Sequence, residues 1–175
     1  MLLEEELSLV VRAKAGEKAA MSALYDTITP KLYGYLVNVL RDKVVAEDIL
    51  QEVWIKAITS LAMFRPQGVR FSAWLFAIAR NECRTHWRKK GREVGIDDTH
   101  VGTSSHVHTE EKVWVDMVIG KLSLEDQEIL RLRYLADLSF KEVARVLNIS
   151  LISARVRVHR ALQKANTMSP DSSSL

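Results

Sequence analysis

Hydrophobic residues recur about every three or four positions through most of the first half of the chain, the spacing of one helix face. Gly16 follows the first group of these residues, so we expect a short first helix that ends there. Thr29 and Pro30 interrupt the next group, because Thr is a favourable cap and Pro suits the first helical position. We therefore expect one helix to end near Ile28 and another to begin at Pro30. The recurring positions are Leu7, Val10, Val11, Ala20, Leu24, Tyr25, Ile28, Leu32, Tyr33, Leu36, Val39 and Leu40.

The segment from about Lys43 to Ala62 predicts an amphipathic helix whose two sides differ in chemistry. Its apolar side consists of Ala46, Ile49, Leu50, Val53, Trp54, Ala57 and Leu61. Its opposite side consists of Asp48, Gln51, Glu52, Ile55 and Thr59. A single aliphatic residue such as Ile55 is ordinary on an exposed, polar surface. The same pattern also fits an interface, in which an acidic patch with an apolar anchor binds a basic partner.

Basic and aromatic residues are interleaved from Arg65 to Arg92, after a turn marked by Pro66 and Gly68. The helix predicted here buries a side made of Phe71, Trp74, Leu75, Ile78 and Ala79. Its other side consists of Phe76, Arg80, Arg84 and Trp87. Cations that bind phosphates, beside rings that stack on bases, suit a strand of nucleic acid. A solvated basic face over a core helix explains the same pattern, so both interpretations stay open.

The composition changes between Gly91 and Thr109, where Gly, Ser, Thr, Asp and His replace the periodic apolar residues. A structureless loop of about 18 residues is unusual inside one compact domain, so we expect a flexible linker between two domains. The linker holds His100, His106 and His108, which are potential metal ligands. Because no Cys or periodic scaffold fixes their geometry, we expect solvated side chains, no metal and no other cofactor.

Charge and cysteine content narrow the class of protein. The net charge is +3, with acidic residues gathered at Glu4–Glu6 and basic residues in Arg65–Arg92 and Arg155–Lys164. The single cysteine, Cys83, excludes an internal disulfide and fits a reducing compartment. No basic region precedes an apolar run at the start, and no apolar stretch approaches about 18 residues. We therefore expect a cytoplasmic protein that does not enter a membrane.

Capping residues divide the rest of the chain, from about residue 111 to residue 166, into short helices. The predicted helix starts are Ser123, Ser139 and Ser150. Ser139 and Glu142 have the spacing of a complete capping box at the start of a helix. Asn148 suits the left-handed conformation at which that helix would end. A short helix, a turn at Asn148 and a longer basic helix together predict a helix-turn-helix.

The last helix, of about fifteen residues, is predicted to have one apolar and one basic side, with no acid between Ser150 and Asn166. The apolar side consists of Leu151, Ala154, Val158, Ala161 and Leu162. The basic side consists of Arg155, Val156, His159, Arg160 and Gln163, flanked by Arg157 and Lys164. Such a helix fits the major groove of DNA, because cations bind phosphates and Arg recognises guanine. A surface helix whose Arg stems cover the core is the alternative.

Three motifs in this order resemble the extracytoplasmic-function group of bacterial RNA polymerase sigma factors. The first is Ala46–Trp54, AEDILQEVW, and the second is Phe71–Arg88, which contains WLFAIARN and HWR. The third runs from Leu122 through LSFKEVA to Ala161. The resemblance implies an all-α fold of two small helical domains joined by a flexible linker. Region 2 is then residues 1–92, the linker 93–110, the region 4 helix-turn-helix 111–167, and a disordered tail 168–175.

The resemblance also implies a specificity subunit that makes and breaks no bonds, with core RNA polymerase, promoter DNA and an anti-sigma factor as partners. The residues implied to bind the clamp helices of the largest polymerase subunit are Asp48, Gln51, Glu52 and Ile55. Those implied to bind the single-stranded minus-ten element are Phe64, Arg80, Asn81, Arg84, Trp87 and Arg88. Those implied to bind the minus-thirty-five element are Ser153, Arg155, Val156, Arg157, His159 and Arg160.

Two rival classes remain. A helix-turn-helix regulator that acts without polymerase explains residues 123–165 equally well, but it gives no role to Asp48–Thr59 or to Arg80–Arg88. A metalloenzyme built on the linker histidines explains those histidines alone. The sequence also departs from the family pattern, because Val156 stands where a small polar residue is usual and Leu151–Ile152 replace a small or turn-forming pair.

Overall fold

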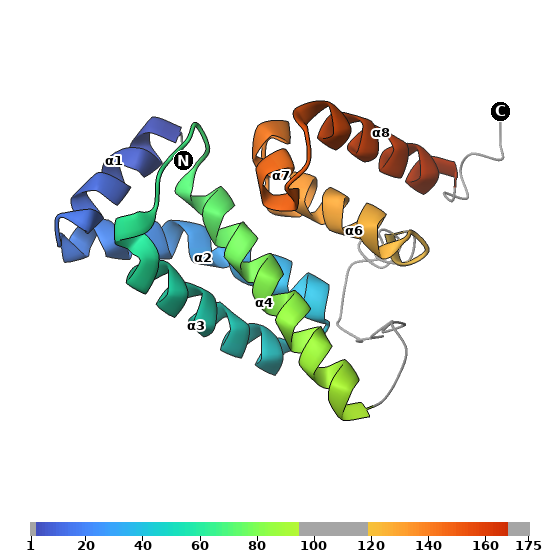
Figure 1. Cartoon of the computed structure of the whole chain (residues 1–175), viewed down its shortest axis with the longest axis horizontal. Helices are drawn as coiled ribbons and strands as arrows, with labels where there is room; N and C mark the ends of the chain where they lie inside the picture. The colour runs from blue at the N-terminus through green and yellow to red at the C-terminus, as the bar shows by residue number, and fades with distance from the viewer. Residues whose placement is uncertain (1–2, 95–118, 168–175) are drawn as a thin grey trace. The chain divides into compact units, whose positions relative to one another are not determined.

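The computed structural model describes residues 3–94 and 119–167, and every regular element in these two ranges is helical (Figure 1). The predicted all-α fold with two helical domains is therefore confirmed. Contacts divide the chain into two units, residues 1–100 and 101–175. The division falls within the predicted linker 93–110, most of which, like the predicted tail 168–175, lies outside the described residues.

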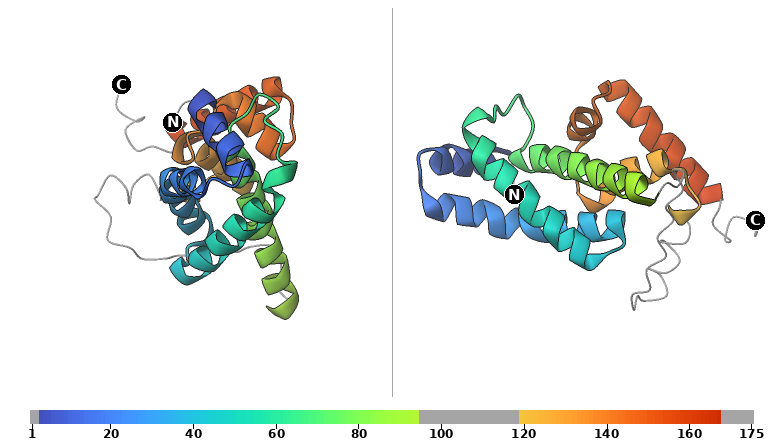
Figure 2. Two further views of the ribbon diagram at one scale, coloured as in Figure 1. Left: turned by 90° about the vertical axis from the view of Figure 1, so that its left-hand side faces the viewer. Right: turned by 60° about the horizontal axis from the view of Figure 1, so that its bottom comes forward.

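The first unit is a bundle in which the long helix α2 packs against the three other helices (Figure 2). Its helices are α1 (Leu3–Lys14), α2 (Lys18–Leu40), α3 (Lys43–Ser60) and α4 (Phe71–Val94), with the short 3-10 helix η1 (Leu61–Met63) after α3. Its largest fully buried side chains are Leu24, Leu32, Tyr35, Leu36, Phe71, Leu75 and Phe76. These residues come from α2 and α4, so the two helices together supply most of the core.

The expectation of two helices meeting at Thr29 and Pro30 is wrong, because α2 runs unbroken through Pro30. The buried positions of α2 continue at helical spacing on both sides of the proline: Ala20, Leu24, Ile28, Leu32, Tyr35 and Leu36. Pro30 itself is exposed. Packing of one continuous apolar stripe outweighs the cost of the backbone hydrogen bond that proline cannot donate.

The buried side of α4 is rotated from the predicted one. Phe76 was predicted to lie on the outer side, but it is 1% exposed, and its ring meets the Tyr35 ring edge to face at 5.4 Å. The buried stripe also continues to Cys83, whereas Trp74 and Ile78 are only half-buried. Residues 71–79 are apolar on almost every side, so periodicity alone could not orient the helix. The contact of Phe76 with the Tyr35 ring of α2 shows which side is buried.

The second unit is smaller, and its last helix packs against both of the helices before it. Its elements are α6 (Leu124–Leu130), a π-helical turn η2 (Arg131–Leu135), α7 (Phe140–Leu147) and α8 (Leu151–Thr167). The core side of α8 consists of Ala154, Val158 and Ala161. Leu151, predicted to share that side, is 40% exposed because it begins the helix beyond the reach of the core.

All three predicted caps of the second unit are confirmed. The Ser123 hydroxyl accepts a hydrogen bond from the Asp126 amide, and Ser150 accepts one from the Ser153 amide at 3.0 Å. Ser139 and Glu142 form both bonds of the capping box, and Asn148 ends α7 with a φ of 53°. Among the described residues, no helix is long and apolar enough to cross a membrane.

Candidate polymerase and DNA interfaces

The outer surface of α3 carries the residues predicted to bind polymerase. Asp42 fixes the start of the helix, since its carboxylate accepts hydrogen bonds from the amides of Val44 (2.9 Å) and Val45 (3.1 Å). Asp48, Gln51, Glu52 and Ile55 all lie on the exposed side. Ile55 is 61% exposed, so a branched aliphatic side chain stands in water between acidic and amide neighbours.

Two further aliphatic residues on this surface escaped the sequence prediction. Val44 is 69% exposed and Ile58 is 52% exposed, and helical geometry places both on the same broad side as Ile55. We call Val44, Asp48, Glu52, Ile55 and Ile58 the α3 surface. The missed signal was the spacing of Ile58 three residues after Ile55, which puts two aliphatic residues side by side on an otherwise polar side.

Phe64, which was predicted to bind the minus-ten element, lies at the start of the connection between η1 and α4. Its side chain is 4% exposed, and its ring packs against the rings of Phe71 and Trp74, with both centroid distances at 5.2 Å. The Phe64 ring, which the resemblance assigned to the minus-ten element, is therefore packed inside its unit, where it anchors the connection between η1 and α4. Three aromatic rings bury more area together than one ring would on a mobile turn, and this packing draws Phe64 inward.

Helix α1 holds both ends of this connection. Lys14 donates a hydrogen bond of 2.6 Å from its Nζ to the Phe64 carbonyl, and its ammonium lies 5.8 Å from the Phe64 ring centroid. The Glu6 carboxylate, 1% exposed, accepts hydrogen bonds from the Ser72 amide and, at 3.2 Å, from the Ser72 hydroxyl. A carboxylate at a helix start satisfies an otherwise unpaired amide and complements the helix dipole.

The other residues predicted to bind the minus-ten element form one stripe along the second half of α4. Asn81, Arg84, Trp87 and Arg88 are exposed, and Arg80 is half-buried at the start of the stripe. At about 100° per residue these five positions fall within roughly one third of the helix circumference. Within residues 80–92 of α4 the only acid is Glu82, which lies off this stripe and pairs with Lys56 at 2.5 Å. The stripe is therefore left cationic, with the Trp87 ring 37% exposed along it.

Helix α8 presents the residues predicted to bind the minus-thirty-five element on its outer side. Arg155, Val156, Arg157, His159 and Arg160 are exposed. Ser153 is only half-buried, and its hydroxyl accepts a hydrogen bond of 2.9 Å from Ser150. The cap thus uses part of the hydrogen-bonding capacity of Ser153, and the Arg155 guanidinium lies 5.9 Å from the centroid of the Phe140 ring.

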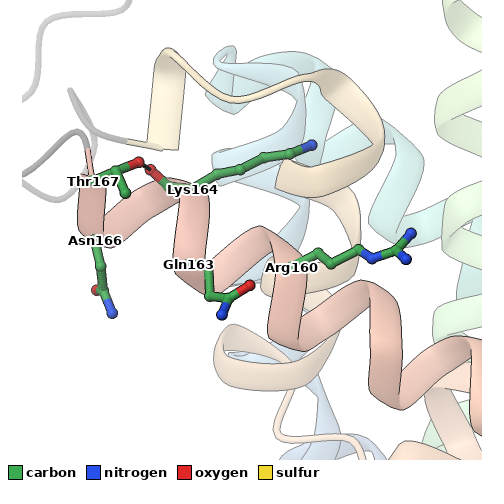
Figure 3. A pocket seen from close by; sticks show the side chains of 5 residues that line it. All are labelled: Arg160, Gln163, Lys164, Asn166 and Thr167. Carbon is green, nitrogen blue, oxygen red and sulfur yellow. Dashed lines mark hydrogen bonds between the residues drawn. The ribbon is translucent and has the colours of Figure 1, made fainter.

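The last turns of α8 are tied to the start of α6. Lys164 donates a hydrogen bond of 2.5 Å to the Asp126 carboxylate, which also accepts one of 2.8 Å from Ser123. The hydrogen bond from Lys164 is the main cause that lowers the pKa of Asp126 from its usual value. Figure 3 shows Arg160, Gln163 and Lys164 beside an open hollow along α8. Asn166 and Thr167 also line this hollow. Because all five lining residues belong to this one helix, the hollow is a helix surface and not an enclosed ligand site.

The described residues contain no cluster of three or more His, Cys, Asp or Glu side chains arranged to hold a metal ion. His100, His106 and His108 lie outside the described residues.

Comparison with known proteins gives the same two modules. Residues 24–93 match the family model of sigma-70 region 2, and residues 112–164 match that of sigma-70 region 4. The chain is 29% identical over 174 residues to the ECF RNA polymerase sigma factor BldN of Streptomyces coelicolor, covering 94% of this chain and 66% of that protein. It is 30% identical over 152 residues to SigM of Bacillus subtilis, covering 83% of this chain and 92% of SigM.

The fold is also that of a solved sigma factor. The sigma factor RpoE of Bartonella quintana, crystallised with the anti-sigma factor NepR, has 23% identity and a TM-score of 0.68 over 85% of this chain and 95% of its own. The order of the two modules, their helices and the sequence similarity together establish that this chain belongs to the extracytoplasmic-function family of RNA polymerase sigma factors.

Proposed function

We propose that this chain binds core RNA polymerase through the α3 surface and places α4 and α8 on promoter DNA to direct transcription initiation. The observation that carries this proposal is the presence of three exposed aliphatic residues, Val44, Ile55 and Ile58, beside the exposed acidic side chains of Asp48 and Glu52 on α3. A partner with basic and apolar groups would bury them. As a sigma factor the chain is an initiation factor and not an enzyme.

Residues 1–92 would act as region 2, and residues 111–167 as region 4, with 93–110 as the linker. In region 2, the stripe of Arg80, Asn81, Arg84, Trp87 and Arg88 would bind the opened minus-ten strand. Cations along one side of a helix, with an exposed ring among them, provide the phosphate and stacking contacts that a single strand needs.

In region 4, the outer side of α8 would enter the major groove of the minus-thirty-five element. The residues assigned to this contact are Ser153, Arg155, Val156, Arg157, His159 and Arg160. The capped turn between α7 and α8 supports this assignment, because Asn148 and Ser150 fix the angle at which the second helix leaves the first.

An anti-sigma factor is the further partner that we propose, with polymerase, DNA and inhibitor meeting in the cytoplasm. The support is the complex of RpoE with its anti-sigma factor, a protein of the same fold. The exposed α3 surface is the part of this chain that such an inhibitor would have to cover in order to block polymerase binding.

The deciding experiment is reconstitution with bacterial core polymerase. We expect the double variant Asp48→Arg with Ile55→Glu to lower polymerase binding at least about tenfold, because it reverses a charge and removes an apolar anchor. The matched control is Asp26→Arg with Val11→Glu, which makes the same changes at exposed positions of α2 and α1. Equal binding by both variants, with unchanged circular dichroism, would remove the α3 surface from the proposal.

The alternative, a regulator that acts without polymerase, makes a different prediction. Such a protein would protect its DNA site from nuclease equally well with and without core polymerase. A sigma factor instead requires core polymerase for full protection of both promoter elements. This comparison uses the intact chain, so it tests the two units together.

A further inference from the structure

The centre of the outer side of α8 is aliphatic and not charged. Ile152 is 74% exposed and Val156 is 41% exposed. The two residues are four positions apart, so their side chains are neighbours on the helix surface. They point away from Ala154 and Val158, which hold α8 against its unit, so the core of that unit does not explain them.

Basic side chains flank this aliphatic pair on the same helix. Arg155, His159 and Arg160 are all exposed, and no acidic residue occurs between Ser150 and Asn166. A stable protein interface usually takes about 20–30 residues from each partner, many more than this pair and its basic neighbours provide. Two aliphatic side chains between basic ones are a better match for a polyanion that displays apolar groups between its negative charges.

The major groove of DNA has this combination. Phosphates line both of its edges, and the C5-methyl group of thymine is the apolar group that a base pair displays on its floor. Ile152 lies in the first turn of α8, and the first residues of a recognition helix are those that contact base edges. The Ser150 cap fixes the backbone of this turn.

We propose that Ile152 and Val156 contact thymine methyl groups in the minus-thirty-five element, and so make this sigma factor select A·T pairs at those positions. The inference rests on the proposed docking of α8 on DNA, and adds to it the chemistry of recognition at two positions. Arg155, His159 and Arg160 then bind the phosphates, or a guanine, on either side of the methyl contacts.

The test begins with selection by reconstituted holoenzyme from promoters that are randomised across the minus-thirty-five element. Each thymine that is enriched is then replaced by deoxyuridine, which lacks only the methyl group. We expect one or two of these replacements to weaken binding by about three- to fivefold, the value of one buried methyl group. The variants Ile152→Ala and Val156→Ala should lose this sensitivity, since they no longer contact the methyl group.

The matched control is Leu124→Ala, which removes a 63% exposed aliphatic residue of α6 in the same unit. This variant should keep the full sensitivity to deoxyuridine. Because Ile152 is largely exposed, its replacement should leave the fold intact, which a melting curve checks.

Several results would overturn the inference. If deoxyuridine has no effect at any selected thymine, or if no A·T pair is enriched, the methyl contact is wrong while α8 still binds DNA. If Ile152→Ala keeps its sensitivity but weakens association with core polymerase, the pair is a protein-docking surface. If no minus-thirty-five sequence is enriched at all, the docking of α8 fails, and the methyl contact fails with it.

Discussion

Helices α4 and α8 carry the two proposed DNA surfaces, yet they begin in different ways. The start of α8 is capped by Ser150, whose hydroxyl accepts a hydrogen bond from the amide of Ser153, three residues later in the chain. The start of α4 is instead capped by the buried carboxylate of Glu6, which lies 66 residues earlier in the chain. One helix therefore carries its own start signal, whereas the other depends on α1 being in place.

The chemistry of the two surfaces differs as well. The α4 stripe combines cations with an aromatic ring, Trp87, and the α8 surface combines cations with Ile152 and Val156. A flat ring can stack on a base that has left the duplex, whereas branched aliphatic side chains can touch only the edges of bases that stay paired. Each surface is therefore suited to a different state of DNA, opened for α4 and duplex for α8.

The largest expected effect separates packed from exposed rings on α4. We expect Phe76→Ala to lower the free energy of unfolding of the first unit by about 3–5 kcal/mol, because a fully buried ring leaves a cavity beside Tyr35. Chemical denaturation followed by circular dichroism measures this. Retention of full stability would mean that Phe76 is on the outer side after all.

The tertiary cap of α4 gives the next effect. Glu6→Gln replaces one accepting oxygen by a donor facing the Ser72 amide or hydroxyl, so we expect a loss of about 1–3 kcal/mol in the free energy of unfolding. Glu4→Gln, at an exposed position of the same helix, is the control and should change stability by less than about 0.5 kcal/mol. Equal effects of the two variants would contradict the cap.

Trp87 tests the stacking role of the α4 stripe. We expect Trp87→Ala to weaken holoenzyme binding to a single-stranded minus-ten oligonucleotide by about 1–3 kcal/mol, with little change in melting temperature. Trp87→Phe keeps an aromatic ring and should retain most of the binding. The role in stacking is wrong if the Phe variant binds as weakly as the Ala variant.

Arg160 tests the duplex contact of α8. We expect Arg160→Ala to reduce the slope of log affinity against log salt concentration by about one, since one fewer phosphate is neutralised. Lys121→Ala, an exposed cation of the same unit outside α8, should leave the slope unchanged. The measurement is holoenzyme binding to a duplex promoter at several salt concentrations.

The smallest effect concerns the Asp126–Lys164 pair, which ties α8 to α6. The pKa of Asp126 is lower in the folded protein than in the unfolded chain, so its contribution to stability is present above about pH 4 and is lost as the pH falls further. We expect Lys164→Met to lower the free energy of unfolding by less than about 1 kcal/mol at neutral pH and to weaken its dependence on acid pH. Lys141→Met, at another exposed lysine, should leave the dependence as it is.

Prediction from sequence succeeded where a signal depends on neighbours within a few positions. The capping box of Ser139 and Glu142, the left-handed Asn148 and the cap at Ser150 all formed as expected. The exposed positions of Asp48 and Ile55 also followed from helical spacing alone. Each of these features depends on backbone geometry that a short segment fixes by itself.

Prediction failed where two local choices were nearly equal. Pro30 allowed either a new helix or a continuous one, and Phe76 and Trp74 competed for the core side of a helix that is apolar on almost every side. Phe64 stood in a turn with nothing in the sequence to show that two other rings would enclose it. In each case the deciding contacts come from other parts of the unit.

Spacing and motifs along the chain were enough to predict the family, the local caps and the helices other than the continuous α2. The tertiary structure was needed to show which rings are buried and that Glu6 caps the start of α4. It was also needed to show that the aliphatic side chains of Val44, Ile58 and Ile152 are exposed. The physical reason is that burial depends on the neighbours that a side chain meets after folding. A helical pattern limits which side of a helix those neighbours can cover, but it does not say where they come from.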